Sequence, residues 1–310
     1  MGNLYFYNVY GLNIKSDIQL NEFVEIDECD TIDINIKSWE PPEELIPKFT
    51  DKCTYLTARN KILFDIQNIG TYEICNGNEI HYKAHNYADP YYLRIFITCS
   101  CIGFAMIQRG KLSIHGGTAV IDDKAVIITG DKGSGKSSLT TALRKKGYKF
   151  ISDDVPAIDF KDKVVVNPGF PYQKLCEDTA INMGYNLDKY FSFMSDTQRK
   201  YVIPVKDDFI DTDTQLGAIF QLAKGDVDKV CIEEIKSSEK ISNIINNIYR
   251  IEFIELLGGL NPLLFKKCVR LAQSVKFYKI TRPQQGFTVN EQIKLIENEI
   301  CSDRTIENIL

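Results

Sequence analysis

The sequence has no excess of basic residues and none of the cysteine pairs that hold zinc. Its 37 Lys and Arg against 42 Asp and Glu leave a net charge of −5. This charge argues against a nucleic-acid partner, because binding a polyanion needs a basic surface. The nine cysteines are an odd number without a CxxC pair, and Cys99 and Cys101 stand too close together for a zinc ribbon. We expect reduced core thiols in a cytoplasmic protein.

Export and membrane signals are also absent from the sequence. The first residues, MGNLYFYNVYG, contain neither the basic segment nor the apolar core of a signal peptide. The longest apolar run, 95–107, is well short of the roughly 20 residues that cross a bilayer. We therefore expect no export and no membrane partner, and we interpret the run as a buried helix. The one basic cluster, at 144–149, is interpreted as a helix end, where cations are favoured, in preference to a polyanion site.

The composition is that of a folded globular protein, with 44% hydrophobic and 25% charged residues. Residues 1–88 are β-rich: TIDINIKS alternates apolar and polar side chains, and YEICNGNEIHY contains an Asn76-Gly77 hairpin turn. A long core helix is predicted from Pro90, with Asp89 as its N-cap, to Gly110. We divide the chain at this point into a β-rich region, 1–88, and an α/β domain, 89–310.

From residue 111 short apolar strands alternate with helices, which predicts an α/β layer. LSIHGGTAVI and KAVIITG flank Asp122-Asp123 and suggest a hairpin. SSLTTALRKK is a predicted helix that stops at Gly147, and KFISDD is a predicted strand. Further predicted elements are the strand GAIFQL, a helix through ISNIINNIYR, a helix starting at Asn261-Pro262, the strand KFYKIT and a terminal helix near NEQIKLIENEI.

The stretch GDKGSGKS, Gly130 to Ser137, matches the phosphate-loop pattern GxxxxGK[ST] in full. An apolar strand precedes it and a helix follows at once, so backbone N–H groups at a helix N-terminus would face the phosphates. Lys136 would reach the β- and γ-phosphates, and Ser137 would bind Mg²⁺. The alternative is a glycine turn that only caps the helix. The predicted cofactors are ATP and Mg²⁺, and the predicted cofactor-binding residues are Gly130, Asp131, Lys132, Gly133, Ser134, Gly135, Lys136, Ser137 and Ser138.

Three other side chains are predicted to meet this loop. Asp153 and Asp154 end the strand after the loop's helix, so in a right-handed βαβ unit both reach the same edge of the sheet, where a base and a magnesium ligand are needed. A tight turn at 122–123 would place His115 opposite Gly130. The alternative for His115 is an ordinary core or surface histidine.

Two further patterns are weaker. His81 and His85 are four residues apart in a segment interpreted as strand or loop, so a metal pair there is not favoured. AKGD, 223–226, follows an apolar strand as a guanine-reading motif would, but Ala223 replaces the Asn that reads the base. We therefore expect ATP in preference to GTP.

The stretch HGGTAVIDDKAVIITGDKGSGKSSLTTALRKKGYKFISDDV resembles the catalytic core of the HPr kinase/phosphorylase family, in which a histidine, a hairpin, a phosphate loop and an Asp-Asp pair follow in this order. YGLNIKSDIQLNEF, DPYYLRIFITCSCIGFAMIQRGKLSIHG and NPGFPYQKLCED resemble the full-length HPr-kinase-like proteins of bacterial peptide-maturation clusters, including lasso-peptide clusters. The resemblance covers nearly the whole chain. It implies an α/β fold with a phosphate-loop core like the HPr kinase C-terminal domain, and an N-terminal β-rich region.

The resemblance also implies roles for individual residues. Lys136 and Ser137 would bind ATP and Mg²⁺, Asp153 would deprotonate the acceptor hydroxyl with His115 nearby, and Asp154 would hold the metal, directly or through water. Weaker candidates for phosphate or substrate contacts are Lys174, Arg199 and Lys200, which are otherwise solvated surface cations. Cys176 stands where relatives often have an aromatic residue, so the shape of the acceptor pocket is open.

The resulting hypothesis is a serine kinase whose acceptor is a precursor peptide, with a lasso-type C-terminal serine favoured, or a small protein, and whose residues 1–88 help to recognise it. The first alternative is a kinase or phosphorylase that acts on HPr or free serine. The second is a non-catalytic protein that binds a nucleotide to set its shape, against which the set His115, Lys136, Asp153 and Asp154 argues. The resemblance allows a homo-oligomer.

Overall fold

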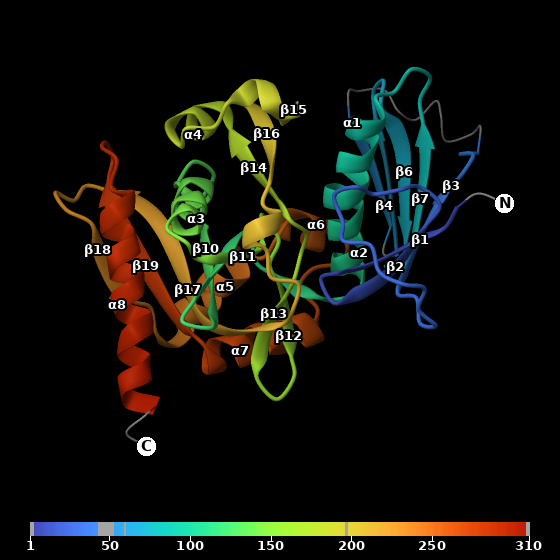
Figure 1. The fold of residues 1–310 in the computed structure, drawn as a ribbon. Helices are drawn as coiled ribbons and strands as arrows, with labels where there is room; N and C mark the ends of the chain where they lie inside the picture. The colour runs from blue at the N-terminus through green and yellow to red at the C-terminus, as the bar shows by residue number, and fades with distance from the viewer. Residues whose placement is uncertain (1–2, 43–52, 59, 196–197, 308–310) are drawn as a thin grey trace. The chain divides into compact units, whose positions relative to one another are not determined.

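The chain is a mixed α/β protein that divides into two compact units. The computed structural model describes residues 3–42, 53–58, 60–195 and 198–307. The first unit comprises Met1–Leu112 with Glu252–Leu264, and the second comprises Ser113–Ile251 with Phe265–Leu310. The helix that follows residue 88, which the sequence division grouped with the later residues, is part of the first unit by its contacts (Figure 1). The assignment of 1–88 to substrate recognition stays a prediction.

A seven-stranded sheet forms the first unit. Strand order is β1 (Tyr5–Val9), β2 (Leu12–Ser16), β3 (Ile34–Ser38), β7 (Glu79–Ala84), β6 (Gly70–Cys75), β5 (Lys61–Ile66) and β4 (Cys53–Ala58). The pairs β2/β3 and β3/β7 are parallel and the others antiparallel. Ile34 and Ile36 are buried while Lys37 is exposed, as the alternating pattern predicts. The predicted hairpin turn forms at Asn76 and Gly77, which both have positive φ.

One long helix packs on this sheet, in three segments: α1 (Pro90–Ile95), the π-helical stretch Phe96–Cys101 and α2 (Ile102–Gln108). Asp89 caps it, accepting a hydrogen bond of 2.7 Å from the backbone N–H of Tyr91, as predicted. The ring of Phe104 lies 5.8 Å from that of Phe64 in the sheet. By length and composition this helix could cross a membrane, yet 61% of the apolar window is buried within the protein. That burial matches a core helix.

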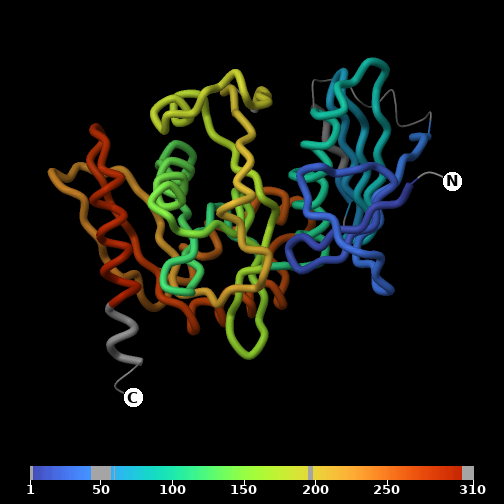
Figure 2. Tube along the Cα trace, viewed as in Figure 1, coloured from blue at the N-terminus to red at the C-terminus, as the bar shows by residue number. Residues whose placement is uncertain are grey.

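The segment Glu252–Leu264 completes the first unit from far along the chain (Figure 2). It contains most of α6 (Ile251–Leu256) and the start of α7 (Pro262–Ser274). Phe253 packs its ring edge-on against Phe104 at 4.7 Å, and Ile254 is buried. Apolar burial of this kind is what holds the segment to the sheet's helix.

The main sheet of the second unit is built around parallel strands. Six strands lie side by side in the order β11 (Lys149–Ser152), β9 (Gly116–Ile121), β10 (Lys124–Gly130), β17 (Thr214–Gly225), β19 (Lys276–Pro283) and β18 (Cys231–Glu234). A second branch starts where β13 pairs with the first residues of β17, and its order is β13 (Val164–Asn167), β12 (Ala157–Phe160) and β8 (Leu112–Ser113). Strands β10, β17 and β19 are parallel, whereas β9 is antiparallel to both of its neighbours. Consequently β10 and β11 point the same way and end at the same edge.

The register of the β9/β10 hairpin is the one that the sequence predicted. Lys124 pairs with Ile121, and the pairing continues in step to Thr129 with Gly116. Asp122 and Asp123 form the two-residue turn with φ of 49° and 60°, the left-handed conformation that Asp tolerates and that such a turn requires.

Two helices cover one face of this sheet. They are α3 (Lys136–Lys145) and α8 (Val289–Glu307), and they share a buried core with the strands: Leu139, Leu143, Ile293, Ile296 and Ile300 pack on Val126, Ile128, Phe220 and Ile280 (Figure 1). The helix predicted through ISNIINNIYR is α5 (Ser237–Asn246), so it ends four residues earlier than expected.

A small three-stranded sheet stands beside α3. Its order is β14 (Tyr172–Cys176), β16 (Gln198–Pro204) and β15 (Ser192–Ser195). Along the chain, α4 (Glu177–Asn182) and the short 3₁₀ turn Leu187–Lys189 connect β14 to β15, and a second 3₁₀ turn, Lys206–Asp208, follows β16. One face of this sheet packs Leu175, Tyr201 and Ile203 on Phe150. The buried hydroxyl of Thr141 in α3 donates 3.0 Å to Gln173 Oε1 of β14, which joins the small sheet to the helix.

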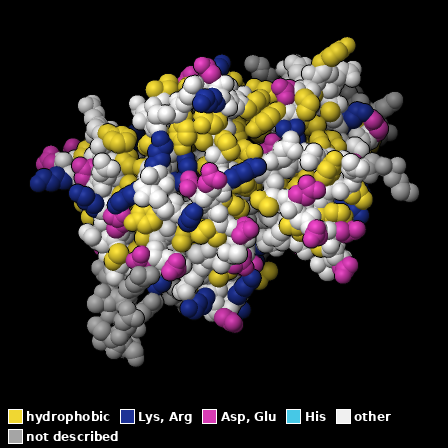
Figure 3. Space-filling view, viewed as in Figure 1, with side chains coloured by type: hydrophobic (Ala, Val, Ile, Leu, Met, Phe, Trp, Pro, Cys, Tyr) yellow, Lys and Arg dark blue, Asp and Glu magenta, His cyan; other side chains and the backbone are white. Residues whose placement is uncertain are grey.

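Charged side chains of both signs are interspersed on the face shown in Figure 3. The expectation of core thiols is right for Cys101 and Cys268 and wrong for Cys231 and Cys301, which are exposed. The two exposed cysteines stand at the outer strand β18 and in the last helix, where no core forms around them.

Candidate active site

The 130–137 loop connects the end of β10 to the start of α3, and its glycines open a space in front of it. Gly130, Gly133 and Gly135 have φ of 132°, 81° and 109°, values that favour glycine. A Cβ atom at Gly133 would meet nothing within 4 Å, and one at Gly135 would meet only the guanidinium of Arg282, at 3.9 Å. Side chains at positions 133 and 135 would therefore point into open space in front of the loop.

A buried hydroxyl without a partner lies in this loop. The Oγ atom of Ser134 is buried and has no hydrogen-bond partner among the residues that the structure describes. Buried polar atoms are normally paired, and the first N–H groups of a helix such as α3 have no partner within it. An anion with several oxygens would satisfy both, so the loop fits phosphate groups.

Lys136 bends its side chain back over the loop. Its Nζ donates to the carbonyl oxygens of Gly130 at 2.7 Å and Asp131 at 3.1 Å. Burial lowers the pKa of this ammonium, while the carboxylates of Asp154 and Asp131 act in the opposite direction. The structure thus gathers the predicted cofactor-binding residues 130–138 in one place, with Asp131 and Lys132 exposed and Ser137 and Ser138 in the first turn of α3.

Asp153 and Asp154 follow β11 and experience opposite electrostatic surroundings. Burial, reinforced by the charge of Asp154, raises the pKa of Asp153 from 3.8 to about 7. Burial also disfavours ionisation of Asp154, but the positive charges of Lys174 and Lys200 outweigh it and hold the pKa of Asp154 below its ordinary value. Lys174 contacts both carboxylates: its Nζ lies 2.6 Å from Asp154 Oδ2, and its backbone N–H donates 2.9 Å to Asp153 Oδ2.

The pair therefore consists of a permanently ionised carboxylate and one that exchanges its proton near neutral pH. Neighbouring acids with separated pKa values are suited to different roles, one as an electrostatic or metal ligand and one as a proton acceptor. Asp154 also has a φ of 59°, a left-handed conformation that is uncommon outside glycine and that sharply turns the chain after the strand.

His115 lies between the loop and the acid pair, held through its backbone. Its carbonyl oxygen accepts a 2.7 Å hydrogen bond from the Thr129 hydroxyl, and its N–H donates 2.7 Å to the carbonyl of Asn247. The next residue, Gly116, donates its N–H to the carbonyl of Asp154 at 3.1 Å. Burial lowers the pKa of the imidazole, against the opposing charge of Asp154. His115 is therefore neutral at physiological pH.

The three predicted substrate cations are not equivalent. Strand β14 pairs Lys174 with Val202 and Cys176 with Lys200 of β16, so Lys174 and Lys200 lie on the same face of the small sheet. The charge of Lys200 acts on both aspartates and on His115. Alternation along β16 puts Arg199 on the opposite face, and it is exposed. Its role in substrate binding stays a prediction.

Sequence reasoning missed two residues at this site. Asn247, just after α5, has its Oδ1 2.7 Å from the Thr129 hydroxyl, and its backbone carbonyl accepts the N–H of His115. Arg282, at the end of β19, donates from Nε to the carbonyl of Ser134 at 3.2 Å. Asn247 gives no local signal. Arg282 could have been noticed as a cation that follows an apolar strand of a parallel sheet.

The two histidines of the first unit do not form a metal pair. His81 Nδ1 lies 2.9 Å from Glu73 Oε2, whereas His85 Nε2 lies 2.9 Å from Asp65 Oδ1. Glu73, Cys75 and His81 are close enough together to share an ion. However, Lys61 Nζ already contacts the second carboxylate oxygen of Glu73 at 2.7 Å, so the negative charge of Glu73 is compensated by the lysine without a metal ion.

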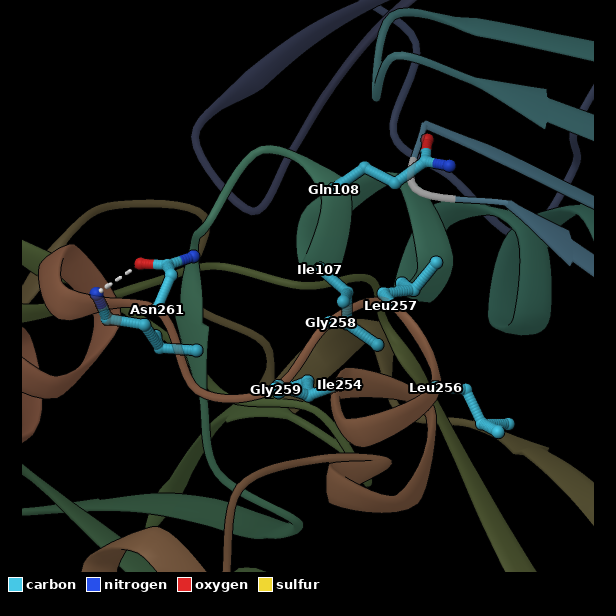
Figure 4. A pocket seen from close by; sticks show the side chains of 9 residues that line it. Ile107, Gln108, Ile254, Leu256, Leu257, Gly258, Gly259 and Asn261 are labelled. Carbon is cyan, nitrogen blue, oxygen red and sulfur yellow. Dashed lines mark hydrogen bonds between the residues drawn. The ribbon is translucent and has the colours of Figure 1, made fainter.

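A cavity of about 650 Å³ in the first unit offers no comparable chemistry (Figure 4). Its lining is aliphatic apart from two amides and two glycines: Ile107, Gln108, Ile254, Leu256, Leu257, Gly258, Gly259, Asn261 and Leu264. The Gln108 amide is bonded to the sheet, accepting from the N–H of Gly77 at 2.7 Å, and Asn261 Oδ1 accepts from the N–H of Leu264 at 2.9 Å. None of the lining side chains is titratable, so proton transfer has no acceptor there.

No protein-family model matches this chain, and neither does any curated protein. Among solved structures, the Hpr(Ser) kinase/phosphatase from Coxiella burnetii is similar to part of it, with 15% sequence identity, 63% of this chain and 98% of that chain covered, and a TM-score of 0.33. A likeness at this level transfers neither a residue's role nor a substrate.

Proposed function

We propose that the protein is an ATP- and Mg²⁺-dependent kinase with a phosphate-loop core of the HPr kinase type, and that it phosphorylates a serine hydroxyl of a peptide or small protein. The precursor peptide of a lasso-type cluster, with serine at its C-terminus, is the proposed acceptor, and residues 1–88 are proposed to help recognise it. The observation that carries this proposal is the oppositely shifted acid pair at the same sheet edge as the lysine-bearing glycine loop.

The residues of the loop fit the phosphates of a nucleotide. The vacant side of Gly133 and Gly135, the unpartnered hydroxyl of Ser134 and the ammonium of Lys136 would hold them. Ser137 and the ionised Asp154 are the oxygen ligands that Mg²⁺ prefers. ATP supplies the phosphoryl group, and the metal ion neutralises charge that develops during its transfer.

Asp153 is the proposed general base. Its raised pKa, about 7, matches the proton affinity that a base needs near neutral pH. It accepts the proton of the serine hydroxyl as that oxygen forms its bond to phosphorus and the bond to the ADP oxygen breaks. Lys136 stabilises the negative charge of the transferred group, and the neutral His115 lines the space between base and loop.

The proposal includes a cytoplasmic location, where ATP is the phosphoryl donor, and neither a nucleic-acid nor a membrane partner. The net charge of −5 supports the absence of a polyanion partner. A homo-oligomer is compatible with the proposal.

The first prediction concerns Lys136. Lys136→Ala removes a charge that acts on the transferred group, so we expect kcat/KM to fall about a hundredfold or more. The assay incubates ATP·Mg²⁺ with a serine-ended precursor peptide, with HPr and with free serine, and detects by mass spectrometry the gain of about 80 Da that corresponds to the addition of HPO3.

Lys189→Ala, an exposed lysine of the same unit, is the matched control and should keep full activity. Full turnover by Lys136→Ala would refute the kinase. Phosphorylation of HPr or free serine in place of the peptide would change the acceptor, and ATP binding without any phosphorylated product would favour a non-catalytic nucleotide-binding protein.

A further inference from the structure

We infer that the nucleoside end of the nucleotide binds over the C-terminal ends of β17 and β19, stacked against the guanidinium of Arg282 and flanked by Phe287. This inference rests on the proposed function and adds to it the place and chemistry of base recognition. Four observations carry it.

The order of strands gives the nucleotide a direction. Strand β10, which feeds the phosphate loop, has β9 and β11 on one side and β17 and β19 on the other. Asp153, Asp154 and His115 all lie on the β11 side. The terminal phosphate must face these groups for transfer to occur, so the opposite end of the nucleotide extends across β17 towards β19.

Arg282 lies on the β19 side of β17, at the level of the sheet edge where the loop begins. In the parallel register Gly130 is level with Leu222, and Leu222 with Ile280, so Arg282 lies two residues beyond the start of the loop. Ile280, two residues earlier, belongs to the core under α3 and α8, which places Arg282 on the same face as the loop. Its Nε donates to Ser134 O at 3.2 Å, and among the residues that the structure describes its guanidinium is the group that a Cβ atom on Gly135 would meet, at 3.9 Å.

The chain that follows Arg282 leads into the layer of helices that contains α3. It leaves β19 and enters α8, whose Ile293 and Ile296 pack in the same core as Leu139 of α3. Within this connection Phe287 leaves 66% of its surface exposed. Single exposed aromatics are common on protein surfaces, but this one stands five residues from an arginine that already contacts the phosphate loop.

Arginine and phenylalanine are suited to the flat face of a base. A guanidinium and an aromatic ring both stack on purines, and stacking does not read the hydrogen-bonding edge. The neighbouring stretch 223–226, at the end of β17, has Ala223 where a guanine-reading motif has Asn, and Lys224 pairs with Arg282. The chemistry therefore selects a purine nucleotide by its faces, so ATP and GTP should respond alike to changes at Arg282.

The experiment compares ADP with inorganic pyrophosphate, which present the same two phosphates with and without a nucleoside. Binding of each, in the presence of Mg²⁺, is measured by calorimetry on the full chain. We expect Phe287→Ala to weaken ADP binding about five- to tenfold and to leave pyrophosphate binding within about twofold. Arg282→Ala should weaken ADP binding by at least as much, and clearly more than it weakens pyrophosphate binding, because its guanidinium also borders Gly135 of the loop. GDP should show the same loss as ADP.

Two controls make the outcomes decisive. Arg270→Ala removes an arginine of α7 that contacts Lys161 and Phe160, and should change neither ligand. Because Arg282→Ala also loses a hydrogen bond to the loop, the exposed Phe287→Ala variant tests the site without that perturbation. Equal losses for ADP and pyrophosphate, or no loss in either variant, would overturn the inference. Failure of the proposed function is distinct: wild-type protein would then bind neither ligand, or Lys136→Ala would leave the binding of both unchanged.

Discussion

At the scale of single residues, Asp153 and Asp154 show how two adjacent, chemically identical groups acquire different proton affinities. Asp153 is buried and Asp154 is partly buried, but Lys174 pairs its ammonium with Asp154 and gives Asp153 only a backbone N–H. The ammonium compensates one negative charge, and the other carboxyl becomes the place where a proton is held. The difference in pKa between the two aspartates therefore depends on Lys174 of β14, a strand that begins roughly twenty residues later in the chain.

This arrangement predicts the pH dependence of the proposed reaction. The base must be ionised, so kcat/KM, which reports groups of the free enzyme, should rise with pH through about 7 as Asp153 loses its proton. Lys174→Met removes a positive charge that lowers the pKa of Asp153, so the midpoint of the rise should move to higher pH. The profile is measured with the peptide acceptor well below KM. A flat profile, or an unshifted midpoint in the variant, would exclude Asp153 as the base.

Lys200 and Arg199, neighbouring cations on opposite faces of β16, provide a matched test of which face binds the acceptor. Lys200→Ala removes a charge that acts on both aspartates and His115, and should lower kcat/KM on the order of tenfold. Arg199→Ala, one position away on the opposite face, should have little effect. Both are compared by initial rates at the same pH. An equal or larger loss in Arg199→Ala would mean that the acceptor binds on the other face.

The sequence alone could predict that His115, the glycine loop and the acid pair lie close together, but not their charge states or the contacts of Asn247 and Arg282. The spacing of His115, the glycine loop and the acid pair is set by one hairpin and one crossover, which local patterns reveal. The pKa of Asp153 and the contact of Arg282 depend on strands from distant parts of the chain, and no local pattern encodes those pairings. The functions of these residues stay predictions until the variants are measured.

At the scale of elements, close packing of α3 on β9 holds the loop's lysine in place. A Cβ atom on Gly117 would approach the side chain of Thr140 to 2.8 Å. Thr140 is buried and donates its hydroxyl to the carbonyl of Lys136 at 2.6 Å, so it cannot move without disturbing the first turn of α3. The glycine allows the helix to lie close to the strand.

We therefore predict that Gly117→Ala destabilises the protein by about 1–3 kcal/mol and weakens ADP binding as well. Stability is measured by urea denaturation and binding by calorimetry. Gly217→Ala is the comparison, because a Cβ there approaches its nearest neighbour, the Cβ of Lys124, to 3.0 Å, a milder overlap than the 2.8 Å at Gly117, and should destabilise less. If the two variants were equally stable, close packing at Gly117 would not matter.

Elements with strong local signals could be predicted, and those defined by tertiary packing could not. The two-residue turn at Asp122-Asp123 determined the hairpin register, and Asp89 marked the start of the long helix. The π-helical stretch inside that helix, the end of α5 at Asn246 and the separate three-stranded sheet have no local signature. They arise from packing, which overrides residue propensity.

At the scale of the whole molecule, the first unit is assembled from two distant parts of the chain. Ile254 is buried in this unit although more than a hundred residues separate it from Leu112. The sequence predicts one division of the chain, because a single composition change is visible near residue 88. It could not reveal that a later segment returns, because short apolar stretches such as 252–257 resemble any other buried helix.

The protein's single tryptophan, Trp39, lies in the first unit and can report on this return. Ile254→Ala should lower the unfolding free energy followed by Trp39 fluorescence in urea by about 2–5 kcal/mol, because it removes a buried side chain. Leu256→Ala, whose side chain is 65% exposed, should change it little. Unfolding of Trp39 that is unaffected by Ile254→Ala would show that 252–264 does not stabilise the sheet.

The central strand of the β11, β9 and β10 group begins where its two neighbours end. Residue 115, just ahead of that strand, therefore lies next to both the 130–137 loop and the acid pair, whatever its side chain is. A cysteine introduced there would carry a fluorescent or cross-linking label into the middle of the site while both flanking strands kept their pairing. The position of residue 115 is thus fixed by the backbone and does not depend on the imidazole, so a chemical probe can replace the histidine there.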